Sequence, residues 1–192
     1  MSTVNKSQLK REALVKATIN LVNNNGFHAT PMSKIAKMAN VSPATIYLYF
    51  ENKQDLINKV YIQVKTAFTE YAFKDYAPTM DVEVGFKVIW NNIANFKLSD
   101  VDEAFFLSQC DNTPMVDEDS RQEGLKHLQP LLDLWQRGID EKKIKPLSAY
   151  LLYAYTVYPV AFLMNMQQRD ILKMDSKSLE DAYTAAWDSI KL

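Results

Sequence analysis

The sequence predicts an all-α protein with a short three-helix module at its N-terminus and a larger helical body. Two observations favour helix: the 192 residues include only 4 Gly and 7 Pro, and apolar residues recur mostly at helical spacing. A third observation, a pair of short helical patterns separated by a tight turn within Thr30–Lys53, marks off the N-terminal module. We expect about nine helices, with the module over residues 1–52 and the body over residues 53–192.

Bulk composition favours a cytoplasmic protein. An apolar content of 47% and a charged content of 23% are ordinary for globular domains. The single cysteine, Cys110, rules out a disulfide within the chain and fits a reducing compartment. The first residues contain no apolar stretch of the kind found in a signal peptide, so we expect none.

Charge is divided unevenly between the two parts. Residues 1–55 hold seven Lys/Arg and three Asp/Glu, a net charge of +4, whereas residues 56–192 hold 15 and 20, a net charge of −5. A basic module on an acidic body suggests a polyanionic partner for the module alone. An excess of four charges also arises by chance in small domains, so charge leaves the partner undecided.

The first helix is expected from Lys6 to Asn24 and to end at Gly26, a residue suited to a left-handed C-terminal position. Thr30 offers a hydroxyl N-cap for a second helix, with Pro31 at the first helical position, where its missing N–H costs nothing. The residues expected to face the core of the first helix are Leu9, Ala13, Ala17 and Leu21.

A tight turn is expected to follow the second helix. Asn40 tolerates a positive φ, and Ser42 is placed to cap a third helix that begins at Pro43. Ile46 and Phe50 lie four residues apart and are expected to face inward. Two short helices joined in this way form a helix-turn-helix.

Every segment of the body is predicted to be helical, apart from a break at residues 111–119. Asn52 is expected to cap a fourth helix, and Ser176 or Ser178 to cap the last one. The expected core-facing stripes are Leu56, Val60, Val64, Ala67 and Tyr71; Phe86, Ile89, Ile93 and Phe96; Leu125, Leu128, Leu132, Trp135 and Ile139; and Leu179, Ala182, Ala186 and Ile190.

The segment Leu147–Met166 allows two interpretations. It is 20 residues long and apolar on all sides, which is the length of a membrane span. It also contains four tyrosines and a central Pro159, and a helix that is apolar all round can equally be buried from several directions. We prefer a central helix that packs on its own domain and on a second subunit.

The third helix carries side chains suited to a DNA groove. Its first turn is built of small residues that permit close approach, and Thr45 can hydrogen-bond to a base edge or contact thymine through its methyl group. Tyr47, Tyr49 and Lys53 can reach phosphates. Taken singly, each tyrosine is more often a packed amphipathic core residue than a DNA contact.

The string TPMSKIAKMANVSPATIYLYFENKQDL resembles the N-terminal signature of the TetR/AcrR family of bacterial transcription regulators, over Leu9 to Leu56. Two departures are visible: Asn40 and Ala44 stand where the family commonly has Gly. The resemblance implies phosphate contacts by Thr30, Tyr47, Tyr49 and Lys53, and positions near base edges for Ser42, Pro43, Ala44, Thr45 and Leu48.

The resemblance further implies a repressor that binds a palindromic operator in double-stranded DNA as a homodimer. It places the dimer contact on the last two long helices, about residues 147–166 and 176–190. A small hydrophobic or amphipathic effector is expected to release the DNA. The residues expected at the dimer interface are Leu151, Tyr155, Val157, Tyr183 and Trp187.

An effector cavity between helices of the body is also implied by the resemblance, but the sequence does not locate it. Aromatic residues at helical spacing are equally typical of a packed core. The residues expected to line the cavity are Phe86, Trp90, Phe105, Phe106, Gln109, Tyr153, Tyr158 and Phe162.

We expect no metal, no cofactor and no enzymatic activity. His28 and His127 are isolated, and with a single cysteine they do not make a zinc site. No phosphate-binding Gly-rich loop or nucleophile elbow occurs. Two alternatives remain: a DNA-bound adaptor whose body recruits a protein without an inducer, and a helical enzyme with an incidental helix-turn-helix.

Overall fold

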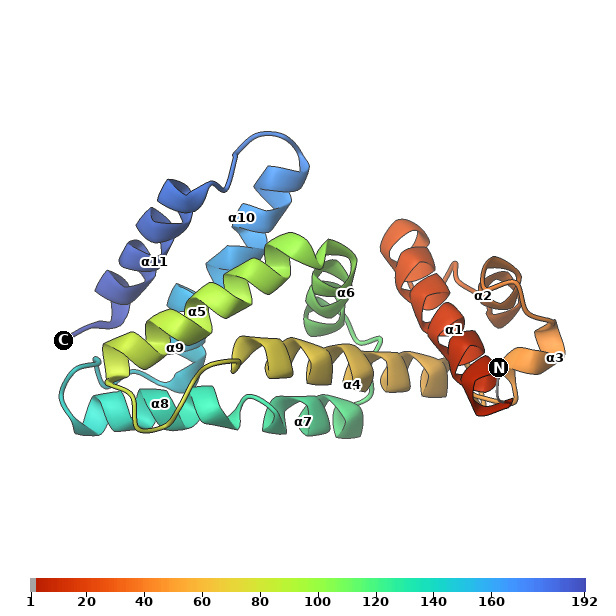
Figure 1. Ribbon diagram of the computed structural model, residues 1–192, viewed down its shortest axis with the longest axis horizontal. Helices are drawn as coiled ribbons and strands as arrows, with labels where there is room; N and C mark the ends of the chain where they lie inside the picture. The colour runs from red at the N-terminus through yellow and green to blue at the C-terminus, as the bar shows by residue number, and fades with distance from the viewer. Residues whose placement is uncertain (1–2) are drawn as a thin grey trace. The chain divides into compact units, whose positions relative to one another are not determined.

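The computed structural model describes residues 3–192 and confirms the all-α prediction (Figure 1). Within that range eleven helices follow one another without a β-strand. They are α1 (Thr3–Asn25), α2 (Met32–Met38), α3 (Pro43–Ile46), α4 (Lys53–Ala72), α5 (Val82–Ser99), α6 (Val101–Asn112), α7 (Glu118–Lys126), α8 (Gln129–Asp140), α9 (Ala149–Thr156), α10 (Tyr158–Gln168) and α11 (Ser176–Ile190).

The chain packs as two compact units. The first consists of the described residues up to Lys65 together with Phe105–Gly124, and the second of Thr66–Ala104 and Leu125–Leu192. Three helices, α4, α6 and α7, therefore contribute residues to both units. The expected boundary between residues 52 and 53 separates the DNA-binding part of the chain from the part that binds the effector and dimerises. Packing does not measure this division of function, so the boundary stays a prediction.

The turns of the first unit form where local sequence chemistry predicts them. Gly26 has a φ of 76° and its N–H donates to the Val22 carbonyl (2.8 Å), which ends α1. Asn40 has a φ of 54° after α2. The Ser42 hydroxyl accepts a hydrogen bond from the Thr45 N–H (3.2 Å) and caps α3.

Two predicted helix caps are wrong, for different reasons. Pro31, rather than Thr30, is the N-cap residue of α2, because the Thr30 side chain bonds to the preceding helix instead. Asp175, rather than Ser176 or Ser178, caps α11 and accepts from the Ser178 N–H (2.9 Å). A carboxylate at this position also interacts favourably with the helix dipole.

Core faces predicted from apolar spacing are only partly confirmed. On α5 all four predicted residues are buried. On α4 the prediction drifts off the core, so that Ala67 and Tyr71 are exposed while Phe68 and Ala72 are buried. The predicted row has spacings of four, four, three and four, which keep it on one face of a helix of 3.6 residues per turn. The buried face of α4 changes along its length instead, since the helix belongs to the first unit up to Lys65 and to the second unit beyond it.

The segment Leu147–Met166 is not one continuous helix. It divides into α9 and α10 at Val157. Pro159 lies in the first turn of α10, where its missing N–H costs nothing, whereas an uninterrupted helix would lose a backbone hydrogen bond there. Over the part of the chain that the structure describes, no helix combines the length and the apolar character needed to cross a membrane.

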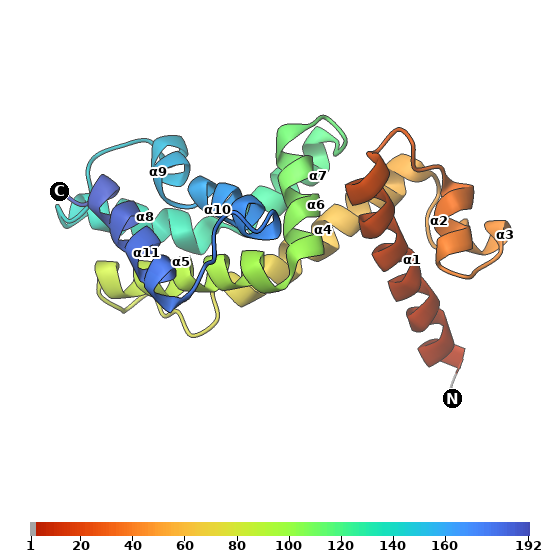
Figure 2. The same cartoon turned by 90° about the horizontal axis from the view of Figure 1, so that it is seen from above.

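In the second unit, α5 packs against α8, α10 and α11 (Figures 1 and 2). The indole N–H of Trp90 donates to the Thr156 carbonyl (2.9 Å) and ties α5 to the end of α9. The Phe86 ring lies 5.7 Å from that of Trp187 and 6.2 Å from that of Tyr183, both on α11. These aromatic contacts fix α11 on α5.

Candidate nucleic-acid interface

Helices α2 and α3 form a helix-turn-helix whose second helix is very short. Only Pro43–Ile46 is α-helical, and the chain continues as a turn through Tyr49. The predicted anchors are confirmed, since Ile46 and Phe50 are fully buried. Between them, Tyr47 and Leu48 project outward, and Leu48 is 82% exposed. Because both ends of this exposed turn are anchored in the core, the turn has little conformational freedom and can present its side chains to a DNA groove.

The residues expected near base edges lie together on this exposed surface. Ser42, Pro43 and Ala44 are exposed and Thr45 is half-buried. The hydroxyl oxygens of Ser42 and Thr45 are 2.8 Å apart and hydrogen-bonded. The pair therefore holds the Thr45 side chain in place at the start of α3.

The Tyr49 hydroxyl connects the turn to α1. It lies 3.1 Å from the hydroxyl oxygen of Ser7, within hydrogen-bond distance. Tyr49 is half-buried, in contrast to the exposed Tyr47. Tyr49 thus positions the turn as well as presenting a phenol near its surface.

Thr30 does not have the geometry of a phosphate contact. Its side chain is fully buried, and its hydroxyl donates to the carbonyls of Leu21 (3.2 Å) and Gly26 (2.9 Å) at the end of α1. The hydroxyl proton is used within the unit. Thr30 is therefore a packing residue that joins α2 to α1, and its predicted side-chain contact with DNA is not supported.

Lys53 begins α4 and has partners within the protein. Its ammonium group donates to the Phe27 carbonyl and lies 4.1 Å from the centre of the Phe27 ring. Partial burial lowers the pKa of Lys53 from its usual value. An ammonium carries three donors, so Lys53 can hold the loop after α1 and still contact a phosphate.

Sequence reasoning missed a concave surface beside the turn, of about 500 Å³. Ser33 and Lys37 of α2 line it together with Asn40 and the start of α3. Both are exposed, and both offer donors that suit a phosphate. The helical spacing of Lys34 and Lys37 relative to the buried Ile35 and Ala36 is the signal that places them on the exposed face of α2.

The second unit brings a subset of the predicted cavity residues together. Trp90 and Phe162 line an apolar groove of about 310 Å³ formed by α5, α9, α10 and α11, and Tyr155 also lines it. Tyr158 is exposed, and Phe86 is fully buried in the core. Phe105, Phe106 and Gln109 belong to the first unit, and Tyr153 is half-buried on α9.

Three of the five predicted dimer residues are buried within the protomer. Val157 is 1% exposed, and Tyr183 and Trp187 are also buried. Val157 lies at the break between α9 and α10, while the two aromatic side chains stack on Phe86. These three residues are core residues and do not present a surface to a second subunit.

The exposed apolar face is formed by different residues of the same helices. Leu151 and Tyr155, the other two residues expected at the dimer interface, are exposed, and Tyr158 and Phe162 continue the row at spacings of four, three and four. Phe162 is 61% exposed and Tyr155 is 54% exposed. Beside this row, Ala185 of α11 is exposed next to the groove. A row of large apolar side chains beside a small exposed residue suits a self-complementary contact between two copies of the chain.

Two family models match the chain. Residues 14–60 match the model described as "Bacterial regulatory proteins, tetR family". Residues 82–191 match the model described as "Tetracyclin repressor-like, C-terminal domain". The first match includes the whole helix-turn-helix, and the second includes the apolar groove and the exposed row.

Individual proteins show the same similarity. The chain is 35% identical over 85 residues to an uncharacterised HTH-type transcriptional regulator of Haemophilus influenzae (44% of this chain and 46% of that protein). It is 37% identical over 62 residues to the fatty acid metabolism regulator protein of Bacillus subtilis (32% of each). The chain thus spans less than half the length of these curated relatives.

Solved structures match over nearly the whole chain. A TetR family transcription regulator from Marinobacter aquaeolei superimposes with a TM-score of 0.92 at 24% identity, covering 98% of this chain and 99% of that one. A TetR-family transcriptional regulator from Haemophilus influenzae gives 0.79 at 25% identity, with the same coverage. The first of these establishes a shared fold alone.

Proposed function

Because the chain belongs to the TetR family of helix-turn-helix transcriptional regulators, we propose that it is a repressor that binds a palindromic operator as a homodimer. The observation that carries this proposal is the exposed turn between the buried anchors Ile46 and Phe50. The family consists of regulators rather than enzymes. A small molecule that favours a different arrangement of the two DNA-binding modules releases the operator.

In this proposal the N-terminus of α3 enters the major groove. Thr45 and Leu48 contact base edges, with Ser42, Pro43 and Ala44 close to the DNA. Tyr47, Tyr49 and Lys53 contact phosphates, and Ser33 and Lys37 of α2 add to these contacts. One such turn covers few base pairs, so two copies related by a two-fold axis are needed to recognise an operator.

The dimer forms through the exposed row of α9 and α10 and the small residues of α11. The row Leu151, Tyr155, Tyr158 and Phe162 offers aromatic side chains, which are enriched at interface cores. This assignment retains the predicted helices and replaces Val157, Tyr183 and Trp187 with residues that reach the surface.

The effector is an apolar or amphipathic molecule. The groove lined by Trp90 and Phe162 is apolar over most of its surface. Its volume lies at the lower end of the range found for small-molecule sites. The similarity to a fatty acid metabolism regulator makes acyl chains the first class to test.

The experiment that tests this function is selection of genomic DNA fragments bound by the purified protein, repeated with a panel that includes fatty acids. We expect enrichment of an inverted repeat and its release by one class of compound. Enrichment without release by any compound would favour the adaptor. Failure to enrich any fragment would contradict the proposal.

Thr45→Ala is expected to change base preference more than general DNA affinity. Loss of one base contact costs about 1–3 kcal/mol at the position it recognises. The measurement compares affinity for the operator, for operators with single substitutions and for random DNA. Thr45→Ser is the matched control, because it keeps the hydroxyl and removes the methyl group. Equal losses on operator and random DNA would show that Thr45 only supports the turn.

Lys53→Ala is expected to weaken binding to all DNA sequences and to reduce the dependence of log affinity on log salt by about one unit. Since Lys53 also holds the Phe27 carbonyl, thermal unfolding is measured alongside. Lys59→Ala is the matched control, because Lys59 lies on the same helix and pairs with Asp55 (2.9 Å). An unchanged salt slope would remove Lys53 from the phosphate contacts.

A further inference from the structure

The segment 105–124, which we call the elbow, packs with the DNA-binding module in one compact unit. It contains most of α6, the connection over residues 113–117 and most of α7. The elbow lies far from the helix-turn-helix in sequence. Its inclusion in this unit raises the question of which contacts hold it there.

A polar network joins the elbow to the first two turns of α4. The side-chain amide of Gln54 donates to the Met115 carbonyl (2.9 Å) and to the Asn58 amide oxygen (2.9 Å). Asn58 donates in turn to the Asp117 carboxylate, and the Asp117 N–H donates back to Asn58 (3.3 Å). Asn58 and Asp117 therefore bond in both directions.

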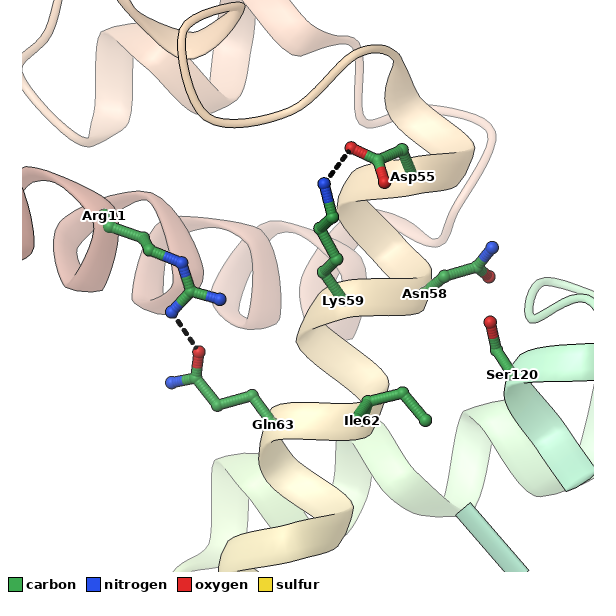
Figure 3. Close-up of a pocket in the computed structure, with 7 residues that line it drawn as sticks. All are labelled: Arg11, Asp55, Asn58, Lys59, Ile62, Gln63 and Ser120. Carbon is green, nitrogen blue, oxygen red and sulfur yellow. Dashed lines mark hydrogen bonds and ion pairs between the residues drawn. The ribbon is translucent and has the colours of Figure 1, made fainter. Parts of the chain in front are cut away.

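Asp117 is held on its other side by α7. Its second carboxylate oxygen accepts from the Ser120 N–H (2.9 Å). Bonds to Ser120, and then to Asn58, lower the pKa of Asp117, so the carboxylate is ionised near neutral pH. Figure 3 shows Asn58 of α4 and Ser120 of α7 on facing sides of a cleft of about 650 Å³ that is lined mainly by residues with polar side chains.

Two further contacts, outside this network, also fasten the elbow to α1 and α4. The Gln109 side chain donates to Asn23 of α1 (3.0 Å). Gly124 lies against the Tyr61 ring of α4 so closely that a Cβ would come within 2.6 Å of its hydroxyl oxygen. Burial, the largest cause, raises the pKa of Tyr61 to about 12.

Helices α1 and α4 are also joined to each other and to the recognition turn. Arg11 of α1 donates to the Gln63 side chain of α4 (2.6 Å; Figure 3). One turn earlier in α1, the Ser7 hydroxyl lies within hydrogen-bond distance of the Tyr49 hydroxyl. The elbow is therefore connected through α1 and α4 to the residues that face DNA.

We propose that Asn58 and Asp117 are positioning residues for operator recognition. They fix the elbow to α4, so that the elbow and the helix-turn-helix move as one rigid block. In the dimer, which this inference takes from the proposed function, the orientation of each block sets the spacing of the two recognition turns. Without the Asn58–Asp117 bonds each block bends within itself, and the dimer accepts half-sites at altered spacing.

The test exchanges the two side chains. Asn58→Asp places two carboxylates against each other and breaks the bond between the side chains. Adding Asp117→Asn restores a donor and an acceptor in the reverse direction, and an asparagine at 117 still caps α7. Asn95→Asp, at an exposed position of α5, is the matched control for the added charge.

The measured quantity is the affinity for the selected operator relative to an operator lengthened by two base pairs between its half-sites. We expect Asn58→Asp to lower this ratio about tenfold, because that is the size of the interaction between residues that share one hydrogen-bond network. Its affinity for a single half-site should stay unchanged, and the exchanged pair should regain the wild-type ratio. A merely structural role would instead weaken half-site and operator binding alike.

The outcomes separate this inference from the proposed function. An unchanged ratio in Asn58→Asp, or a ratio that the exchanged pair does not recover, would overturn the positioning role while operator binding stands. A wild-type protein that binds neither operator would contradict the proposed function, and the positioning role with it. A lowered ratio in Asn95→Asp would assign the effect to charge alone and also overturn the role.

Discussion

Phe162→Glu is expected to convert the dimer into monomers and to abolish operator binding at concentrations where the wild type binds. Phe162 is 61% exposed on the apolar face of α10, so the substitution leaves the protomer core intact. In a two-fold dimer it places two unpaired carboxylates in the interface, at a cost of roughly 3–5 kcal/mol by analogy with a broken buried pair. At about one decade for each 1.4 kcal/mol, that cost corresponds to a dimer weaker by about a hundred-fold to several thousand-fold.

Sedimentation of the purified variant, with thermal unfolding in parallel, checks this result. Val84→Glu is the matched control, because Val84 is also exposed and lies on α5 outside the groove. A Phe162→Glu protein that remains dimeric would move the interface to another face. A charge at Val157, in contrast, would enter the protomer core and could not distinguish a lost interface from unfolding.

Ile46→Ala and Leu48→Ala are expected to separate folding of the DNA-binding module from contact with DNA. Ile46 is fully buried, and its truncation costs about 2–5 kcal/mol of module stability. Leu48 is 82% exposed two residues further on, so its truncation leaves stability within about 0.5 kcal/mol. Both variants lose operator affinity, for different reasons.

Hydrogen exchange of the module and sedimentation of the dimer distinguish the two effects. In Ile46→Ala, amides of α1 to α3 should exchange faster while the protein stays dimeric. In Leu48→Ala, exchange should match the wild type although operator binding falls. Wild-type operator affinity in Leu48→Ala would show that this turn does not face DNA. Loss of the dimer in Ile46→Ala would contradict the expected independence of residues 1–52 and 53–192.

The turns of the DNA-binding module could be predicted because their causes are local. Gly26 and Asn40 adopt the left-handed conformations that few other residues accept. The side chains of Ser42 and Asn52 each accept a hydrogen bond from the backbone N–H three residues ahead, in the first turn of the helix that follows. Thr30 has an equally good local pattern for a cap, but its hydroxyl bonds to the carbonyls that end α1. These carbonyls lie outside the local capping pattern, and their hydrogen bonds with the hydroxyl replace the predicted cap.

The face of each body helix could not be predicted, because burial there depends on several neighbours at once. An apolar residue in Leu147–Met166 is equally consistent with a core and with an interface. The structure separates them, with Val157 buried and Tyr155 exposed. The contact between Asn58 and Asp117 joins residues 59 positions apart, and both are common polar surface types. The sequence around neither residue contains a pattern that predicts their contact.

The central claim, that two chains recognise one palindrome, is tested most directly by the stoichiometry of the complex with the strongest selected fragment. Native mass spectrometry of that complex is expected to show two chains on one fragment. The sequence of that fragment should contain an inverted repeat with half-site centres about 34–36 Å apart, or a multiple of that distance. Phe162→Glu should give no complex of two chains under the same conditions. A single wild-type chain that saturates an asymmetric site would contradict the claim.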